Sequence, residues 1–353
     1  MECNFTVRKR GNKWHLVCSY KTSTGWKQKT KGGFDFRKEA LSTEAKSEMI
    51  KQIENEAKLE PSFKNVTFPQ MLEFYLSQNS TLAYNTKMVY RNSVKNLGPL
   101  NQIPMKDVKL MDILNLLRPM SVSKQREVRK VLGMLYRSAV MYKAISENPL
   151  LGYKFPPLES DKETKRLRTF TEEEIADVMG AVDSEADLIM AIAAATGMRC
   201  GEILGLTWSD IDFINNEIHV SKQWKLLSKE NNKYVYGWGD VKNKHGNRTL
   251  YLPPSLRRIL LEYKSRHPIN ISGRISRFDT AARVNEYVRR RFPNHSMHDF
   301  RHTFGTRLSL SCPNVTIIAA TLGDAEETVL KTYLDFNDEM RRQAQNHIAA
   351  MFQ

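Results

Sequence analysis

The stretch His298-Asp299-Phe300-Arg301-His302-Thr303-Phe304-Gly305-Thr306 has the pattern of a helix that holds phosphate. Residues three apart on a helix project from the same face, so His298 and Arg301 lie side by side. Ser296 and Asp299 form a capping-box-like start, which puts that pair in the first turns. Helix starts present free backbone N–H groups and partial positive charge, and an arginine fork fits two phosphate oxygens. The stretch therefore predicts a phosphate clamp.

The chain carries a large excess of positive charge. Its 353 residues include 54 lysines and arginines against 39 aspartates and glutamates, a net charge of +15 with a pI near 9.5. Such an excess suits a polyanionic partner, because each phosphate that is neutralised releases bound counterions. Residues 1–38 alone contain ten basic and two acidic residues, a net charge of +8. Charge by itself does not exclude a basic protein without special affinity, but this concentration favours a contact with nucleic acid.

The cysteines and apolar segments favour an intracellular protein. Four cysteines lie far apart in the sequence and form no CxxC pair: Cys3, Cys18, Cys200 and Cys312. This spacing predicts neither a disulfide framework nor a metal site, and it fits a reducing cytoplasm. The apolar run Leu188–Ala195 is too short to cross a membrane, and residues 1–4 contain no apolar signal region. We therefore expect a cytoplasmic protein without membrane contact.

Residues 3–36 alternate in the manner of a small β-sheet. Three short segments rich in aromatic and β-branched residues are separated by turn residues: 5–8, 14–20 and 26–31. A helix is expected to follow over 37–58. Alternation places Lys27, Lys29 and Lys31 on one face of the third strand, and a sheet with a basic face fits a DNA groove. The alternative is a solvated lysine face, and the spacing alone favours that alternative.

The middle of the chain has the periodicity of a helical bundle. Four segments between residues 66 and 147 are expected to be helices: Thr67–Ser77, Thr86–Leu97, Met111–Leu117 and Ser123–Met141. Basic residues crowd the start of the last helix, and Lys124, Arg126 and Arg129 are candidate DNA contacts. A charged stretch with two prolines, over 150–168, is the clearest hinge in the sequence.

The region after residue 168 combines helices with a few strands. Two helices lead to a glycine turn that ends at Arg199. Two alternating segments, Glu217–Leu227 and Arg248–Leu252, predict strands with Lys242 on a hairpin between them. Further helices are expected to begin near Ser255, Ala281, Ser296, Asn314 and Glu326.

These patterns predict a multidomain, mainly α-helical protein. Its first domain, 1–60, is expected to be a small three-stranded β-sheet with a helix. A helical bundle at 61–155 and a mixed α+β domain at 165–353 are expected to follow. We find no internal repeat and no low-complexity tract in the sequence.

The third region resembles the tyrosine recombinases, the family that includes phage and conjugative-transposon integrases. Residues 196–212 look like their first arginine motif, and 241–250 resemble their lysine hairpin. Residues 298–306 are similar to their second box, and 322–333 to their tyrosine box. The basic N-terminal unit, with Gly32-Gly33-Phe34, resembles the arm-DNA-binding module of these integrases. The middle bundle is similar to their core-binding domain, more weakly, so the resemblance covers nearly the whole chain.

The resemblance implies a catalytic set spread over the last 155 residues: Arg199, Lys242, His298, Arg301, Asp324 and Tyr333. Tyr333 would attack a DNA phosphate to give a 3′-phosphotyrosyl link and a free 5′-hydroxyl. Arg199 and Arg301 would hold the non-bridging oxygens in the transition state. Lys242 would protonate the leaving 5′-oxygen, and His298 would assist proton transfer at the tyrosine. The covalent link conserves the energy of the broken bond, so neither a cofactor nor a metal is expected.

One position departs from the family pattern. The family usually has His or Trp nine residues before the nucleophile, where this chain has Asp324. A carboxylate beside a phosphate repels it unless the carboxylate is protonated or turned away. His302 or His295 could supply the missing hydrogen-bond donor. We interpret Asp324 as a mark of slower or more conditional chemistry, and less as a mark of a dead enzyme.

Each implied site residue also has a plainer interpretation. Arg199 could simply pair with Glu202, and Lys242 shares its hairpin with Lys244, where lysines are mostly solvated. Tyr333 is one of thirteen tyrosines and could be an ordinary residue of an amphipathic helix. Their joint occurrence, in order and at matching separations, favours the functional interpretation.

The expected function is that of a site-specific DNA recombinase, an integrase of a phage or transposon. The expected partners are double-stranded DNA at core and arm attachment sites and three further copies in a DNA-bound tetramer. An excisionase and a host DNA-bending factor at the bacterial nucleoid are further expected partners. A catalytically weak or silent DNA-binding protein and a type IB topoisomerase are the rival functions. The tail is expected to form a helix that docks either on its own domain or on a neighbouring copy. Its apolar residues at helical spacing are Met340, Ala344, Ile348 and Phe352.

Overall fold

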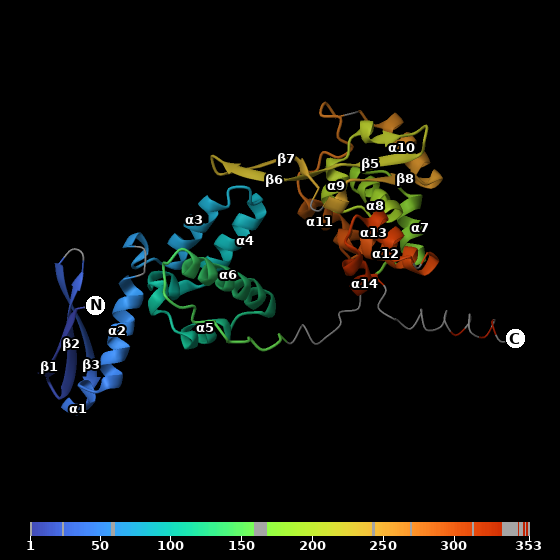
Figure 1. Cartoon of the computed structure of the whole chain (residues 1–353). Coiled ribbons are helices and arrows are strands. Elements are labelled where there is room, and N and C mark those ends of the chain that lie inside the picture. Colours follow the sequence, from blue (N-terminus) through green and yellow to red (C-terminus); the bar gives the residue numbers. More distant parts are fainter. Residues whose placement is uncertain are drawn as a thin grey trace. The chain divides into compact units, whose positions relative to one another are not determined.

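The computed structural model describes residues 2–22, 25–57, 61–158, 168–241, 244–268, 270–312 and 314–333, together with positions 345, 349 and 351. The chain forms two compact units, Met1–Thr164 and Lys165–Gln353 (Figure 1). The first unit contains a β-sheet and a helical bundle, and the second has a mixed α+β fold, which confirms the predicted fold class. Within the described ranges, we find no helix with the length and apolar character of a membrane span.

The N-terminal sheet has three antiparallel strands in the order β1-β2-β3. Two helices follow its strands, and the bounds are β1 (Cys3–Arg10), β2 (Lys13–Thr22), β3 (Gly25–Phe34), α1 (Arg37–Ala40) and α2 (Thr43–Ala57). Leu16 and Cys18 of β2 form a small core with Met49 and Ile53 of α2. The strands are longer than the predicted segments, and the single helix predicted over 37–58 is divided into α1 and α2.

The helical bundle has the four helices that the periodicity predicts, each within about two residues of its expected bounds. Its elements are η1 (Pro61–Phe63), α3 (Phe68–Gln78), α4 (Tyr84–Lys95), η2 (Gly98–Gln102), η3 (Met105–Asp107), α5 (Leu110–Leu117) and α6 (Val122–Met141). A capping box between Thr67 and Gln70 starts α3. The buried rings of Phe68 and Tyr136 meet edge to face with centroids 5.5 Å apart and fix α3 against α6.

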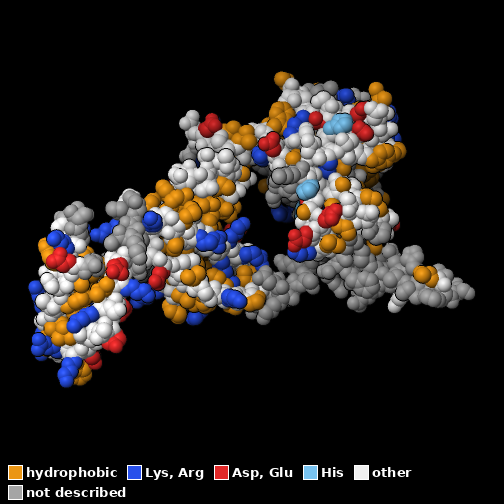
Figure 2. All heavy atoms as spheres, viewed as in Figure 1, with side chains coloured by type: hydrophobic (Ala, Val, Ile, Leu, Met, Phe, Trp, Pro, Cys, Tyr) orange, Lys and Arg blue, Asp and Glu red, His pale blue; other side chains and the backbone are white. Residues whose placement is uncertain are grey.

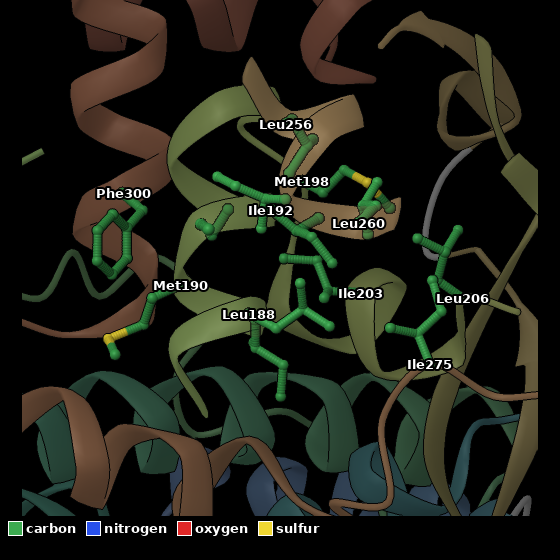
Figure 3. Packing of buried hydrophobic residues seen from close by; sticks show 14 of the residues in the cluster. Leu188, Met190, Ile192, Met198, Ile203, Leu206, Leu256, Leu260, Ile275 and Phe300 are labelled. Carbon is green, nitrogen blue, oxygen red and sulfur yellow. The ribbon is translucent and has the colours of Figure 1, made fainter. Parts of the chain in front are cut away.

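The second unit is built around the apolar helix α8. Its helices are α7 (Glu172–Gly180), α8 (Glu185–Thr196), α9 (Cys200–Gly205), η5 (Trp208–Asp210), η6 (Lys244–Gly246), α10 (Pro254–Arg266), α11 (Ala281–Arg291), α12 (Met297–Ser311), α13 (Val315–Leu322) and α14 (Glu326–Tyr333). Leu188 and Ile192 of α8 are fully buried among side chains from α9, α10 and α12, including Leu260 and Phe300 (Figure 3). This helix is apolar on every side, as expected for a helix surrounded by others.

The strands of the second unit are more numerous than the two that were predicted, and β4 is among the additional ones. They are β4 (Ile211–Asp212), β5 (Glu217–Val220), β6 (Lys222–Glu230), β7 (Lys233–Asp240) and β8 (Arg248–Tyr251). β4, β5 and β8 form one antiparallel sheet, whereas β6 and β7 form a separate two-stranded ribbon. The single strand predicted over Glu217–Leu227 is therefore two strands, and β7 was missed. Asn231 and Asn232, with φ of 48° and 65°, make the tight turn that this ribbon needs.

Candidate active site

The turn between α8 and α9 fixes the first arginine of the site. α8 ends at Gly197, whose φ of 63° lies in the left-handed region. A side-chain carbon added to this glycine would lie 2.6 Å from Phe304 and 3.0 Å from Leu322, so only glycine fits. The turn places Arg199 at the N-cap of α9, with its guanidinium directed toward the end of α13.

Two arginines meet on one carboxylate at the centre of the site. Arg199 Nη2 donates hydrogen bonds to Asp324 Oδ1 and, at 3.1 Å, to the carbonyl oxygen of Gly323. Arg301 Nη2 donates to Asp324 Oδ2 at 2.5 Å, and its Nη1 donates to the carbonyl oxygen of Gly197 at 2.9 Å. The three charged groups come from α9, α12 and the α13–α14 junction, so tertiary packing brings together residues more than 100 positions apart.

A second carboxylate lies behind Arg199. The buried Glu202 accepts hydrogen bonds from Arg199 Nη1 and Arg248 Nη2, both at 2.9 Å. Burial alone would raise the pKa of Glu202, but Arg248 and Arg199 outweigh it and hold that pKa below its usual range. Arg248 also donates to the carbonyl oxygen of Thr321 at 2.8 Å, which ties β8 to α13. Neither Glu202 nor Arg248 was a predicted site residue, although the plainer interpretation of Arg199 named its pairing with Glu202.

Tyr333 lies in the same site of the same chain. Its side chain is 5% exposed, and its hydroxyl lies 3.4 Å from Nδ1 of His302. Burial raises the pKa of Tyr333, while the neighbouring Arg301 opposes that shift. The ring rests on Gly305 of α12, where an added side-chain carbon would lie 2.6 Å from the ring. The expected gathering of two guanidinium groups and one phenol is therefore present within a single chain.

The pKa values of both histidines of the site, His298 and His302, are lowered. Burial, and then Arg301, lower the pKa of His298. Burial, and then His298, lower the pKa of His302 to about 4, and the two rings lie with centroids 4.4 Å apart. His295 is not in the site, because its ring stacks on Phe170 at 4.0 Å. Of the two histidines considered as substitutes at position 324, only His302 lies near the phenol.

Part of the predicted set lies outside the described residues. Lys242 is not among the described residues, so its position relative to the two arginines stays a prediction. The tail positions Met340, Ala344, Ile348 and Phe352 also lie outside the described residues. Within the described ranges, no group of three or more His, Cys, Asp or Glu side chains is placed to hold a metal ion.

The register of the N-terminal sheet decides which of its faces is open. Lys27, Lys29 and Lys31 do share one face, but their cross-strand partners include Leu16 and Cys18, which pack on the helix side. Lys31 makes an ion pair with Glu48 of α2 at 2.6 Å. The opposite face carries a different polar set, which the sequence analysis missed: Arg8, Arg10, His15, Ser19, Lys21, Trp26, Gln28 and Thr30.

The basic cluster on α6 has mixed roles. Lys124 and Arg126 are exposed. Arg129 is half-buried, donates to the carbonyl oxygen of Pro156 at 2.9 Å and stacks over Phe155 at 4.6 Å. The guanidinium of Arg129 therefore ties the segment after the bundle to α6, and a DNA contact of this residue stays a prediction.

Replacement of Gly305 by alanine should destabilise the second unit. The added methyl group would overlap the Tyr333 ring, and overpacking of this kind typically costs about 1–3 kcal/mol. Gly180→Ala is the matched control, because an added carbon at Gly180 in α7 meets nothing within 4 Å. Chemical denaturation of the full chain measures both free energies of unfolding. Equal stability of the two variants would contradict the close packing of Tyr333 on Gly305.

Comparisons with known proteins agree with this geometry. Residues 168–340 match the phage integrase family, and residues 6–53 match an arm DNA-binding domain. A protein named tyrosine recombinase XerC-like, from Caldanaerobacter subterraneus subsp. tengcongensis, is 30% identical over 188 residues, covering 50% of this chain and 48% of that protein. The ICEBs1 integrase of Bacillus subtilis is 27% identical over 217 residues, covering 58% and 56%. The chain thus spans about half the length of these curated relatives.

Solved structures share the fold. The Tn1549 transposon integrase in complex with a circular intermediate DNA has a TM-score of 0.63 at 19% identity, covering 80% of this chain and 99% of that one. A lambda integrase dimer bound to a COC′ core site has a TM-score of 0.54 at 19% identity, covering 94% of each chain. The family match spans both arginines of the site, the bridging carboxylate and the phenol. Residues 168–340 of the chain therefore belong to the phage integrase family of tyrosine recombinases.

Proposed function

We propose that the chain is a site-specific DNA recombinase of a mobile element, which cleaves and rejoins DNA through a 3′-phosphotyrosyl intermediate. The observation that carries this proposal is the convergence of Arg199, Arg301 and the Tyr333 hydroxyl around one anionic group in a single chain. That group is the Asp324 carboxylate, and in the DNA-bound enzyme the scissile phosphate takes its place. The family match and the DNA-bound integrases that share the fold support the proposal.

The proposed chemistry is a transfer between two oxygens at phosphorus. The Tyr333 oxygen bonds to phosphorus, and the bond from phosphorus to the 5′-oxygen breaks. The departing oxygen takes a proton, in our proposal from Lys242, and leaves as a 5′-hydroxyl. Arg199 and Arg301 stabilise the charge on the non-bridging oxygens, and loss of one such fixed donor typically costs about 3–4 kcal/mol of barrier. Attack by a 5′-hydroxyl of another strand reverses the step and exchanges strands.

The phenol proton needs an acceptor as the new bond forms. His302 is placed for this, because its Nδ1 lies 3.4 Å from the hydroxyl and its lowered pKa keeps the ring neutral. A phosphate anion arriving beside the ring favours the protonated imidazolium, which makes His302 a better base at the moment of attack. His298 lies one helical turn earlier on α12 and supports the phosphate and the ring of His302. We therefore assign the proton transfer to His302.

The three expected domains have distinct proposed roles. Separate hydrophobic clusters in the N-terminal sheet unit, the helical bundle and the second unit support domains at 1–60, 61–155 and 165–353. We assign arm-site binding to the first, core-site binding to the second and strand cleavage to the third. Lys and Arg side chains lie on the visible surface of the first two (Figure 2). Lys124 and Arg126 on α6 are the proposed contacts of the bundle with DNA.

The proposed working form is a tetramer on DNA. A lambda integrase tetramer bound to a Holliday junction shares the fold, with a TM-score of 0.52 at 19% identity, and supports this assembly. Exchange of two strand pairs needs four tyrosines on one junction, which gives the physical reason for four copies. A phage or transposon as the source, an excisionase, a host DNA-bending factor and action at the nucleoid belong to the same proposal.

A nicked substrate tests the proposed chemistry. DNA that spans the ends of the element encoding the chain, with a nick beside the scissile phosphate, should trap a covalent complex with the full chain. That complex should survive denaturant and be absent with Tyr333→Phe, which lacks the nucleophilic oxygen. Arg199→Lys should bind DNA but lose at least about a hundredfold in cleavage, because a point charge does not grip two oxygens. Arg266→Lys, on the exposed end of α10, is the control. DNA binding without any adduct would favour the silent DNA-binding protein.

The role of His302 has its own test. His302→Asn keeps an acceptor near the position of Nδ1 but does not take up the proton. We expect adduct formation to slow by about 10²–10⁴-fold while DNA binding is retained. Single-turnover assays with the nicked substrate measure the rate. An Asn variant as fast as the wild type would show that His302 orients the phenol and is not its base.

The open face of the sheet should dominate binding to arm DNA. Arg8→Ala removes a charge from that face, and Lys27→Ala removes the same charge from the helix side. We expect Arg8→Ala to weaken binding more and to reduce the salt dependence by about one counterion. Titrations at several salt concentrations measure both. A larger effect of Lys27→Ala would overturn the assignment of faces.

A further inference from the structure

The position between the guanidinium groups of Arg199 and Arg301, here called the phosphate seat, is occupied by the carboxylate of Asp324. Asp324 presents one carboxylate oxygen to Arg199 and the other to Arg301. The side chains of Arg301 and Asp324 are 2% and 14% exposed, and that of Arg199 is 20% exposed. Water therefore has little access, and the charge-assisted hydrogen bonds are stronger than the same bonds on the surface.

A DNA phosphate would accept hydrogen bonds from the same arginine donors. Its two non-bridging oxygens carry one negative charge, as the two oxygens of a carboxylate do, and both groups fit the arginine fork. The two anions cannot share this space, because like charges at contact distance repel strongly where water is scarce. The phosphate and the Asp324 carboxylate therefore compete for Arg199 and Arg301.

The backbone around Asp324 is fixed by the end of α13. Gly323 ends α13 with a φ of 68°, and the backbone N–H of Asp324 donates to the carbonyl oxygen of Ala319 at 3.1 Å. A side-chain carbon at Gly323 would lie 2.9 Å from Arg248 Nη1 and from the carbonyl oxygen of His245, so the chain is tightly packed there. With the backbone held in this way, displacement of the carboxylate from the arginines requires rotation about its own side-chain bonds.

The internal anion also holds the arginines together before DNA arrives. Burial, and then the neighbouring Arg199, lower the pKa of Arg301, which reflects the cost of two cations in one poorly hydrated place. Asp324 neutralises part of that charge, and the hydrogen bonds from Arg199 to Glu202 and from Arg301 to Gly197 O fix the other ends. The arginines of the phosphate seat are therefore fixed before DNA binds, and the Asp324 carboxylate occupies the space between them.

We propose that Asp324 is a displaceable internal ligand of the phosphate seat, which makes it a specificity-determining residue for strand cleavage. A phosphate enters only when the remaining contacts between protein and DNA hold it firmly enough to replace the carboxylate. Loosely held DNA leaves Asp324 in place and stays uncut. This inference rests on the proposed function for its consequence, but the competition itself concerns only an anion and two arginines.

Inorganic phosphate tests the competition without any DNA. Titration calorimetry on the full chain should give at least about tenfold tighter phosphate binding for Asp324→Ala and Asp324→Asn than for the wild type. Glu327→Gln is the matched control, because it removes one negative charge from an exposed position on α14 nearby. Thermal melting with and without phosphate checks that each variant is folded and gives a second measure, since phosphate should raise the Tm of both Asp324 variants more. Equal or weaker phosphate binding by both variants would overturn the inference.

Cleavage assays separate this inference from the proposed function. With the nicked substrate, Asp324→Ala should form adducts on DNA with shortened flanks that the wild type and Glu327→Gln leave uncut. Covalent adducts without any gain in phosphate affinity would contradict the proposed role of Asp324 and still support the recombinase function. Tighter phosphate binding by the Asp324 variants, without covalent adducts from any variant, would support the competition for the arginines and contradict the recombinase chemistry.

Discussion

The second unit depends on a series of side chains of alternating charge that are mostly shielded from water. Arg248, Glu202, Arg199, Asp324 and Arg301 follow one another, each in contact with the next. Removal of one partner from such a series leaves a buried charge unpaired, which typically costs about 3–5 kcal/mol. The series links α9, β8, α12 and the α13–α14 junction, so the catalytic geometry and the packing of these elements are one property. The phenol is held against the same series by α12.

The site combines preorganisation with occupancy. Donors that are fixed before the reaction stabilise a transition state without any cost of reorganisation. Fixed cations in a poorly hydrated place, however, need an anion at all times. In this chain a carboxylate of the protein supplies that anion, and the departure at Asp324 from the family pattern acquires a physical meaning from its two arginine partners. The same contacts stabilise the packing of the second unit and, in our proposal, set a threshold for the phosphate.

In the N-terminal sheet, strand pairing decides which face packs on the helix. The three-stranded sheet packs one face on the following helices and leaves the other face uncovered by them. The periodicity of β3 correctly indicates that Lys27, Lys29 and Lys31 share a face. Which face meets the helix depends on the pairing of β3 with β2, and the apolar residues Leu16 and Cys18 decide it. The lysines of β3 therefore lie on the helix side of the sheet.

The sequence by itself determined the mainly helical fold, the four helices of the bundle, the three-stranded sheet and the order of the site residues, because these follow from local periodicity and from motifs. The β6–β7 ribbon was within reach of the same reasoning, since Asn231-Asn232 between alternating segments is a hairpin signal. Only the tertiary structure decided that Asp324 lies between Arg199 and Arg301, and that His302 rather than His295 meets Tyr333. The physical reason is that these contacts join residues from separate helices, whose side chains meet only after α8, α12 and α13 have packed around one core.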